Sequence, residues 1–147
     1  MSHIFSTETK TTTRPRHDAT IRIQYLGPDD TKWGGQWRTV ELPGKVEGDL
    51  LVTNSCPPTP LHIAVARVGE VAFVGLGCEG FNEIGQAIKA GSPFAQTIII
   101  THCNGAAGYL PTRAAYLEGG YEVRSSRFAP AAAEQVIKEA VHMLHTL

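Results

Sequence analysis

The chain has 147 residues, of which 42% are hydrophobic and 18% are charged, and its formal net charge is -1. This length fits one ordinary domain with a real apolar core. The near-zero net charge argues against disorder driven by charge excess and against a polyanion-binding surface, so we expect no nucleic-acid partner. No apolar run approaches the roughly 20 residues that a membrane-spanning helix needs, and the start lacks the apolar core of a signal peptide. We therefore expect a soluble chain with no transmembrane segment, in the cytoplasm or secreted.

The start of the chain is rich in Thr and contains Pro, and we predict that residues 1–18 are flexible. Residues 19–147 are then expected to form one folded domain. The three cysteines, Cys56, Cys78 and Cys103, lack the spacing of a zinc finger. They are predicted to be buried or half-buried thiols rather than a disulfide framework or a structural zinc site.

Strand patterns dominate the first half of the chain. Residues 20–26 alternate apolar and polar side chains, which predicts a half-buried strand. Residues 36–42 predict a second strand, and residues 49–53 predict a weaker third. Residues 61–68 alternate again and residues 71–76 are continuously apolar, with a Gly-Glu dipeptide between them. That spacing predicts a hairpin with a two-residue turn.

A strand-to-helix junction follows the hairpin. Apolar residues recur at helical spacing over residues 81–90, and Gly91 can end that helix. Glu79 therefore lies between a buried strand and a helix, where the carboxyl ends of strands meet helix N-termini and sites are common. The alternative for Glu79 is an ordinary acid that stabilises the helix N-terminus.

The next strand leads into a glycine-containing loop. Residues 97–101, with the sequence TIIIT, are all β-branched and predict a strand that is buried on both faces. The loop at 102–108 leads to Tyr109. His102 and Cys103 begin this loop and are expected near Tyr109, in supporting or packing roles because no acid or third partner is visible beside them.

The C-terminal third is predicted to be helical. A short helix is expected at 112–117, and residues 121–127 fit more than one structure. Pro130 is expected near the first turn of a long final helix. Its apolar stripe consists of Val136, Ile137, Ala140, Val141, Leu144 and Leu147. Strands early and helices late predict an α/β or α+β fold, in which helices cover a mixed β-sheet in a single layered domain.

No Walker loop, dinucleotide-binding glycine pattern, HExxH or GxSxG sequence is present. The chain instead carries an ordered series of segments: LGCEGFNEIGQAIKAGSPF, then NGAAGYLPTRAAYLEGGYEV, then RFAPAAAEQVIKEAVHML. Over about residues 61–147 this series resembles the neutral and alkaline non-lysosomal ceramidases. In that family a strand ends in a Pro-Gly-Glu turn before a helix, and the next strand leads to an Asn-containing loop, a Tyr and a later Tyr-Glu pair.

The resemblance implies roles for three residues. Glu79 and Tyr109 match the family's carboxylate and tyrosine zinc ligands, and Tyr121 matches the phenol that assists the scissile carbonyl. In the family two histidine ligands and the serine nucleophile come from an N-terminal half. The resemblance therefore implies the C-terminal part of a zinc-dependent amide hydrolase, acting on an N-acyl amide lipid such as ceramide and incomplete without that half or a partner chain.

Other interpretations stay open at the level of sequence. Tyr109 can be a half-buried aromatic that packs under its loop. Gly77 and Cys78 replace the family's Pro-Gly, which favours a non-catalytic interaction or small-molecule-binding domain with a ceramidase-like fold. A homo-oligomer in which histidines of a neighbouring copy complete the site is a third possibility.

Overall fold

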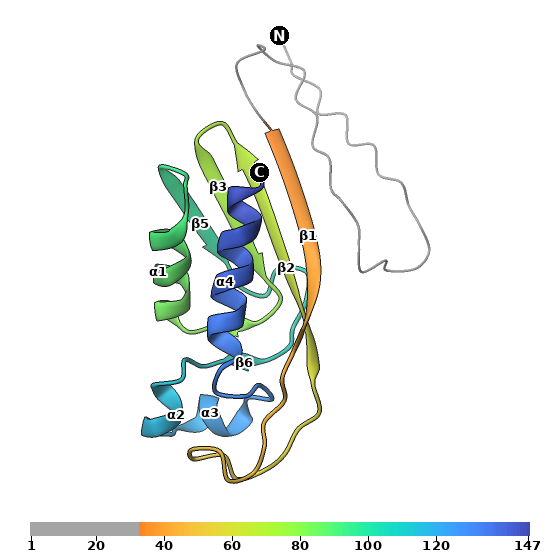
Figure 1. Ribbon diagram of the computed structural model, residues 1–147, viewed down its shortest axis with the longest axis vertical. Coiled ribbons are helices and arrows are strands. Elements are labelled where there is room, and N and C mark those ends of the chain that lie inside the picture. Colours follow the sequence, from red (N-terminus) through yellow and green to blue (C-terminus); the bar gives the residue numbers. More distant parts are fainter. Residues whose placement is uncertain (1–32) are drawn as a thin grey trace, which may run out of the picture.

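The computed structural model describes residues 33–147 (Figure 1). The predicted flexible segment 1–18 and the predicted strand at 20–26 lie outside the described residues. The described elements form a mixed sheet with helices, in one small layered domain that ends in a long helix. This arrangement confirms the predicted fold class.

Four strands form the main sheet in the order β1-β2-β3-β5. Their bounds are Trp33–Leu42 for β1, Thr59–Val68 for β2, Val71–Leu76 for β3 and Gln96–Ile100 for β5. The β2-β3 hairpin is confirmed, since Val68 pairs with Val71 and Gly69 takes a positive φ of 59° in the turn. β5 runs parallel to β3, and the crossover between them contains α1, Asn82–Gly91, as a parallel pair requires.

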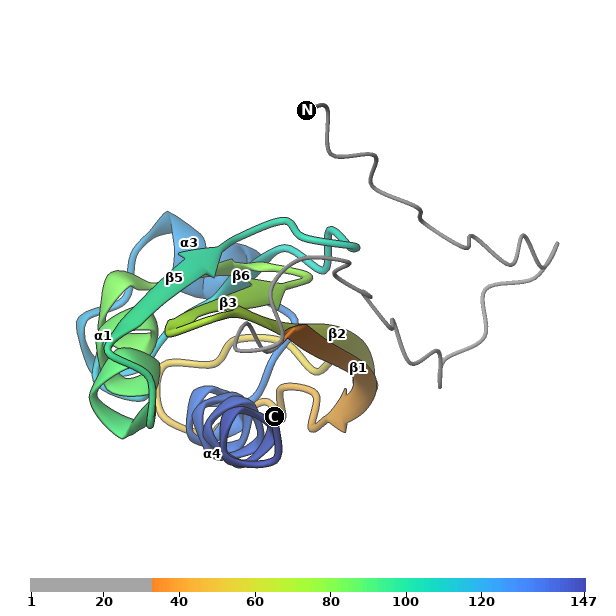
Figure 2. The ribbon, with the colours of Figure 1, turned by 90° about the horizontal axis from the view of Figure 1, so that it is seen from above.

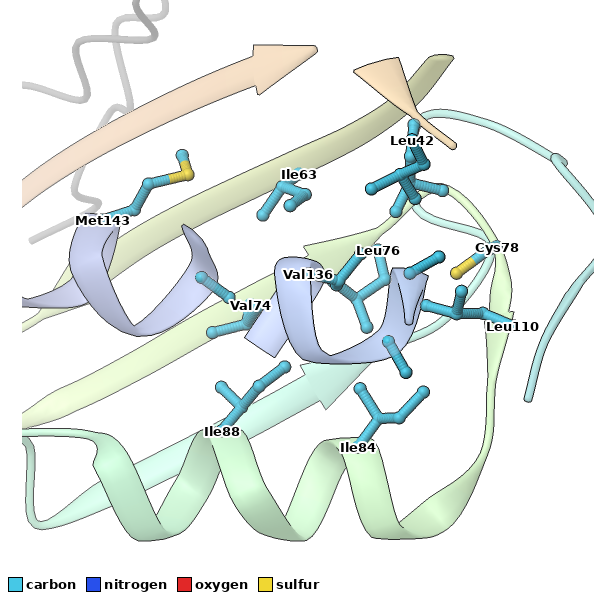
Figure 3. Close-up of a cluster of buried hydrophobic side chains, with 14 of the residues drawn as sticks. Leu42, Ile63, Val74, Leu76, Cys78, Ile84, Ile88, Leu110, Val136 and Met143 are labelled. Atoms are coloured by element: carbon cyan, nitrogen blue, oxygen red, sulfur yellow. The ribbon is translucent and has the colours of Figure 1, made fainter. Parts of the chain in front are cut away.

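The hydrophobic core lies between one face of this sheet and two helices. Figure 2 shows α1 and α4, Ala132–His145, on the same side of the sheet. Every second residue of β2 and β3 is buried there, beneath the predicted stripe of α4. Burying one such side chain fully contributes about 1.5–3 kcal/mol. Figure 3 labels ten members of this core: Leu42, Ile63, Val74, Leu76, Cys78, Ile84, Ile88, Leu110, Val136 and Met143.

The other face of the sheet is largely apolar, and the described residues cover it only partly. Side chains of β5 alternate, so that Ile98 and Ile100 are 46% and 43% exposed while Ile99 packs against the core. The prediction that 97–101 is buried on both faces is therefore wrong. A β-branched run indicates strand propensity, but it does not show whether a second layer covers the strand.

We call this surface the open face. The strand register places two groups of half-buried or exposed side chains on it: the apolar Trp37, Ala64, Ala66, Phe73, Ile98 and Ile100, and the polar Thr39, Glu41, His62 and Gln96. The arginines of the described strands lie on the helical side, where Arg38 Nη1 is 2.7 Å from Glu139 Oε1 of α4 and Arg67 stacks on Phe94. The open face therefore carries no arginine or lysine from these strands.

The weaker strand predicted at 49–53 is a turn. Leu50 has a positive φ of 55°, and the Val52 N–H donates to the Asp49 carbonyl at 3.1 Å. The local hydrogen bonds of this loop replace any sheet pairing. Val52 is buried against Tyr116 and Val123 in a second, smaller cluster.

Two short helices complete the lower end of the molecule in Figure 1. α2 spans Ala115–Glu118, which overlaps the second half of the predicted helix at 112–117, and it ends at Gly119, which has a positive φ of 79°. α3 spans Tyr121–Ser125, which resolves the ambiguous segment as helical. The Tyr116 hydroxyl is buried and donates to the Phe128 carbonyl at 2.6 Å, so α2 is fixed to the segment that leads into α4.

Cys78 is fully buried in the core, whereas Cys56 and Cys103 are half-buried. Burial raises the pKa of the Cys78 thiol from its ordinary 9.0 to about 12. We expect a thiol reagent at pH 8 to modify Cys56 and Cys103 in the folded protein and Cys78 only after denaturation. Because folding raises this pKa, Cys78 favours the folded state below pH 9, and its contribution is lost between pH 9 and about 12. Rapid modification of all three thiols in the folded protein would contradict this burial.

Candidate functional site

Two very short strands bring the predicted site residues together. β4, Glu79–Gly80, and β6, Tyr109–Leu110, pair in parallel with Glu79 directly opposite Tyr109. Side chains on directly paired residues point to the same side of a sheet. Glu79 and Tyr109, which are thirty positions apart in the sequence, are thereby neighbours at the carboxyl end of β3.

Backbone contacts hold the two segments in register. The Ala107 N–H donates to the Gly77 carbonyl at 2.8 Å, and the Glu79 N–H donates to the Gly108 carbonyl at 2.9 Å. A Cβ on Gly105 would approach the Gly77 backbone to 3.2 Å, so the loop needs a glycine there to lie this close. Gly108 has a positive φ of 85° immediately before Tyr109. These contacts therefore fix the backbone position of Tyr109 relative to Glu79.

The third predicted residue, Tyr121, lies beside Tyr109. The two ring centroids are 6.0 Å apart with an interplanar angle of 80°, an edge-to-face contact. Tyr121 is the first residue of α3 and is 63% exposed. The negative charge of Glu79 raises the pKa of the Tyr109 phenol, and desolvation, Tyr121 and Glu122 act in the same direction. The Tyr109 phenol is therefore protonated at neutral pH in the absence of a cation.

His102 makes a contact that the sequence did not predict. Its Nε2 atom lies 3.4 Å from Glu79 Oε2, and both side chains are about half exposed. Sequence reasoning expected His102 near Tyr109 in a supporting role, whereas the structure brings its imidazole directly to Glu79. The signal was its position just after β5, because β5 lies next to β3 and both strands end at this edge.

The two cysteines near the site face away from the carboxylate. Cys103 packs against Gly75, where an added Cβ would meet its Sγ at 2.5 Å. Cys78 points into the core among the side chains of Figure 3. The Gly77-Cys78 replacement therefore adds a core side chain and no thiol beside the exposed Glu79.

A hollow of about 360 Å³ lies near the site, and Gly80, the residue after Glu79, is one of its lining residues. It lies between α1 and β5 and is lined by Gly80, Phe81, Gln86, Ile99 and Thr101 among others. Its walls combine apolar side chains with amide and hydroxyl groups. Glu79 itself does not line this hollow, which adjoins it through Gly80, the next residue in the chain.

The donor atoms at this site suit a divalent cation. Carboxylate oxygen and imidazole nitrogen are ordinary zinc ligands, and a phenolate oxygen adds negative charge. Among residues 33–147, no three side chains of the His, Cys, Asp and Glu types come together as a metal-binding group. A cation site here therefore depends on the Tyr109 phenol or on ligands from elsewhere.

The fold and the paired strands first define the class: a layered α/β domain with a polar side-chain cluster at the carboxyl end of its central strands. Solved ceramidases share this fold. A ceramidase complexed with C2 aligns with 70% of this chain and 20% of its own, with a TM-score of 0.58 and 21% sequence identity. The neutral ceramidase from Pseudomonas aeruginosa aligns with 74% of this chain and 24% of its own, with a TM-score of 0.57 and 19% identity.

These comparisons establish a ceramidase-like fold. The chain spans about a fifth to a quarter of the length of these two enzymes, given the 20% and 24% coverage of their chains. No protein-family model and no curated protein sequence matches the chain. Within residues 33–147, no helix has both the length and the apolar character needed to cross a bilayer.

Proposed function

We propose that this chain is the C-terminal part of a zinc-dependent amide hydrolase of the neutral ceramidase type. Glu79 and Tyr109 are zinc ligands, and Tyr121 assists the scissile carbonyl. The substrate is an N-acyl amide lipid such as ceramide. Two histidines and a serine nucleophile come from a segment or partner chain that corresponds to the uncovered part of the ceramidases.

One observation carries this proposal. Glu79, Tyr109 and Tyr121 come from three separate segments of the chain, were singled out by the sequence resemblance alone, and lie close together at one end of the sheet. Glu79 pairs with Tyr109 through the backbone, and Tyr109 contacts Tyr121 through its ring. All three are half-buried or exposed, so their polar atoms can reach a ligand from outside the domain. A packing role for Tyr109 alone would not require the carboxylate and the second phenol beside it.

The residues present fit zinc as part of a larger ligand set. When bound, zinc polarises a carbonyl and lowers the pKa of a coordinated nucleophile. Glu79 supplies a carboxylate oxygen. Tyr109 must lose its proton to bind as phenolate, and its raised pKa means that this happens only with a cation in place.

Tyr121 is suited to act on the substrate rather than on the metal. Its exposed hydroxyl can donate a hydrogen bond to the carbonyl oxygen, and this bond strengthens as negative charge grows on that oxygen. The Tyr109 and Tyr121 rings contact each other edge-to-face. In this proposal Tyr109 therefore binds the metal, whereas Tyr121 acts on the substrate carbonyl.

The open face supports the need for a further segment. A sheet face with several exposed apolar side chains is costly to leave in water, and a second layer normally covers it. The chain spans only 20% and 24% of the two ceramidases, which leaves ample sequence in such enzymes to form that layer. The same layer would bring the missing histidines toward Glu79.

Co-expression with a polypeptide that carries two histidines and a serine tests this function. We expect the complex to release fatty acid from a short-chain N-acylsphingosine. Glu79→Ala and Tyr109→Phe should abolish bound zinc and turnover together. Tyr121→Phe should keep the zinc and lower kcat by about a hundredfold or more with little change in KM, as loss of one oxyanion donor does.

Glu83→Ala is the matched control for Glu79→Ala, because Glu83 is an exposed acid in the first turn of α1. It should leave zinc content and turnover unchanged. Full turnover in Glu79→Ala or Tyr109→Phe would overturn the proposal. So would a complex that binds zinc through these residues but hydrolyses no amide lipid.

A further inference from the structure

We propose that His102 is a third zinc ligand, so that Glu79, Tyr109 and His102 let this chain hold a zinc ion by itself. The inference deepens the proposed function and rests on its assignment of Glu79 and Tyr109. The resemblance to ceramidases assigns no role to His102. The argument comes from the position of this imidazole at the carboxylate.

The distance between His102 and Glu79 fits two ligands of one metal ion. Zinc binds histidine nitrogen and carboxylate oxygen at about 2.0–2.2 Å with tetrahedral angles, which places two ligand atoms about 3.4 Å apart. His102 Nε2 and Glu79 Oε2 are 3.4 Å apart. A charge-assisted N–H···O hydrogen bond is typically shorter, at about 2.7–2.9 Å. The direct contact is therefore long for a hydrogen bond, and the same spacing fits two ligands of one zinc ion.

The backbone of His102 is fixed against the turn that carries Glu79. The His102 N–H donates to the Cys78 carbonyl at 3.0 Å, and the Cys103 N–H donates to the Leu76 carbonyl at 2.9 Å. These bonds join the start of the 102–108 loop to the residues just before Glu79. The two backbone segments that carry these side chains are thus held together, which lowers the entropy that binding would otherwise cost.

His102 also has an unusual backbone conformation. Its φ is 53° and that of Asn104 is 59°, both in the left-handed region. Non-glycine residues in this region cost free energy and cluster at functional sites. In this conformation the imidazole reaches Glu79.

An exposed ion pair is the competing explanation. Such pairs contribute little to stability, so a strained backbone would gain little from forming one. Tyr109 lies opposite Glu79 in the β4-β6 pair, and Glu122 adds negative charge near the same phenol. A cation among His102, Glu79 and Tyr109 would neutralise this charge, and the open, half-exposed side leaves room for a substrate or further ligands.

Calorimetric titration of the full chain with zinc chloride, after chelator treatment, tests the inference. We expect one zinc ion per chain. His102→Asn should weaken binding at least about tenfold, because asparagine tolerates a positive φ but lacks the imidazole. His102→Gly, which relieves the backbone strain, should have the same effect. Control variants are His142→Asn, exposed on α4, and the pair His3→Asn and His17→Asn; all should bind zinc as the parent does.

The outcomes separate this inference from the proposed function. Zinc binding that is lost in Glu79→Ala and Tyr109→Phe but kept in both His102 variants would overturn the inference and leave the function intact. No zinc binding by the chain alone would also overturn the inference, while the co-expressed complex still tests the function. Zinc binding that survives in all these variants would contradict both.

Discussion

Replacing Lys45 with methionine should lower the free energy of unfolding by about 3–5 kcal/mol. Lys45 is 2% exposed, and its Nζ donates to the Val123 and Arg124 carbonyls at 3.0 Å each. These carbonyls belong to the last turn of α3, where no helical N–H is available to them. Methionine keeps the length and the apolar stem of the side chain but leaves both oxygens without their donor.

The burial of Lys45 also lowers the pKa of its ammonium group, because desolvation disfavours the charge, while Cys56 acts weakly in the other direction. The two carbonyls and the more distant Asn54 Oδ1, at 3.5 Å, hold the charged form in place. Lys45→Met therefore removes the donor of these hydrogen bonds, and the destabilisation comes from the buried carbonyls that are left without a partner.

Denaturant unfolding measures this effect, with Lys138→Met as the matched control because Lys138 is exposed on α4. The control should change stability by less than about 0.5 kcal/mol. Since α3 begins with Tyr121, Lys45→Met should also loosen the edge-to-face contact between Tyr121 and Tyr109. A loss of less than about 1 kcal/mol would mean that water replaces Nζ at the two carbonyls.

Periodicity predicted the sheet and its helices well because these elements are defined by local patterns. The alternation in 61–68 corresponds to a buried face in the structure. Of the predicted stripe, Val136, Ala140 and Leu144 are buried on α4, whereas Leu147 lies beyond the end of the helix. The same reasoning failed for 97–101, since its β-branched residues fit either a covered or an open sheet face. It also gave no sign of Lys45, whose burial depends on carbonyls nearly eighty residues away.

The candidate site was predicted through the order of its segments rather than through any one motif. Nothing in the local sequence pairs Glu79 with Tyr109; the β4-β6 register does so. His102 was expected nearby because it follows a strand, but its contact with Glu79 depends on a positive φ that the sequence does not specify. Long-range backbone contacts decided both positions.

The second large effect is expected at Gly44, a position where any side chain meets backbone. A Cβ on Gly44 would lie 2.0 Å from the Cys56 carbonyl oxygen and 2.4 Å from that of Pro57. Backbone atoms cannot move aside as the end of a flexible side chain can. Gly44→Ala should therefore destabilise the fold by about 3 kcal/mol, the upper end of the usual cost of overpacking.

The cost at Gly44 should also spread to neighbouring contacts. Gly44 forms an isolated bridge with Phe128. The N–H of the adjacent Lys45 donates to the Arg127 carbonyl, and the Lys45 carbonyl accepts from the Cys56 N–H. A shift of the Cys56 segment would strain these bonds and the seat of the Lys45 ammonium group together. Gly44→Ala and Lys45→Met should then be less than additive in a double-mutant cycle.

Gly34→Ala is the matched control, because its added Cβ would meet only side-chain atoms at 3.9 Å or beyond, in ordinary contact. Thermal unfolding should leave this variant within about 0.5 kcal/mol of the parent. Equal stability of Gly44→Ala and Gly34→Ala would show that the Cys56–Pro57 backbone yields without cost. Strict additivity with Lys45→Met would instead place the strain at Gly44 alone, apart from the Lys45 contacts that hold α3 and Tyr121.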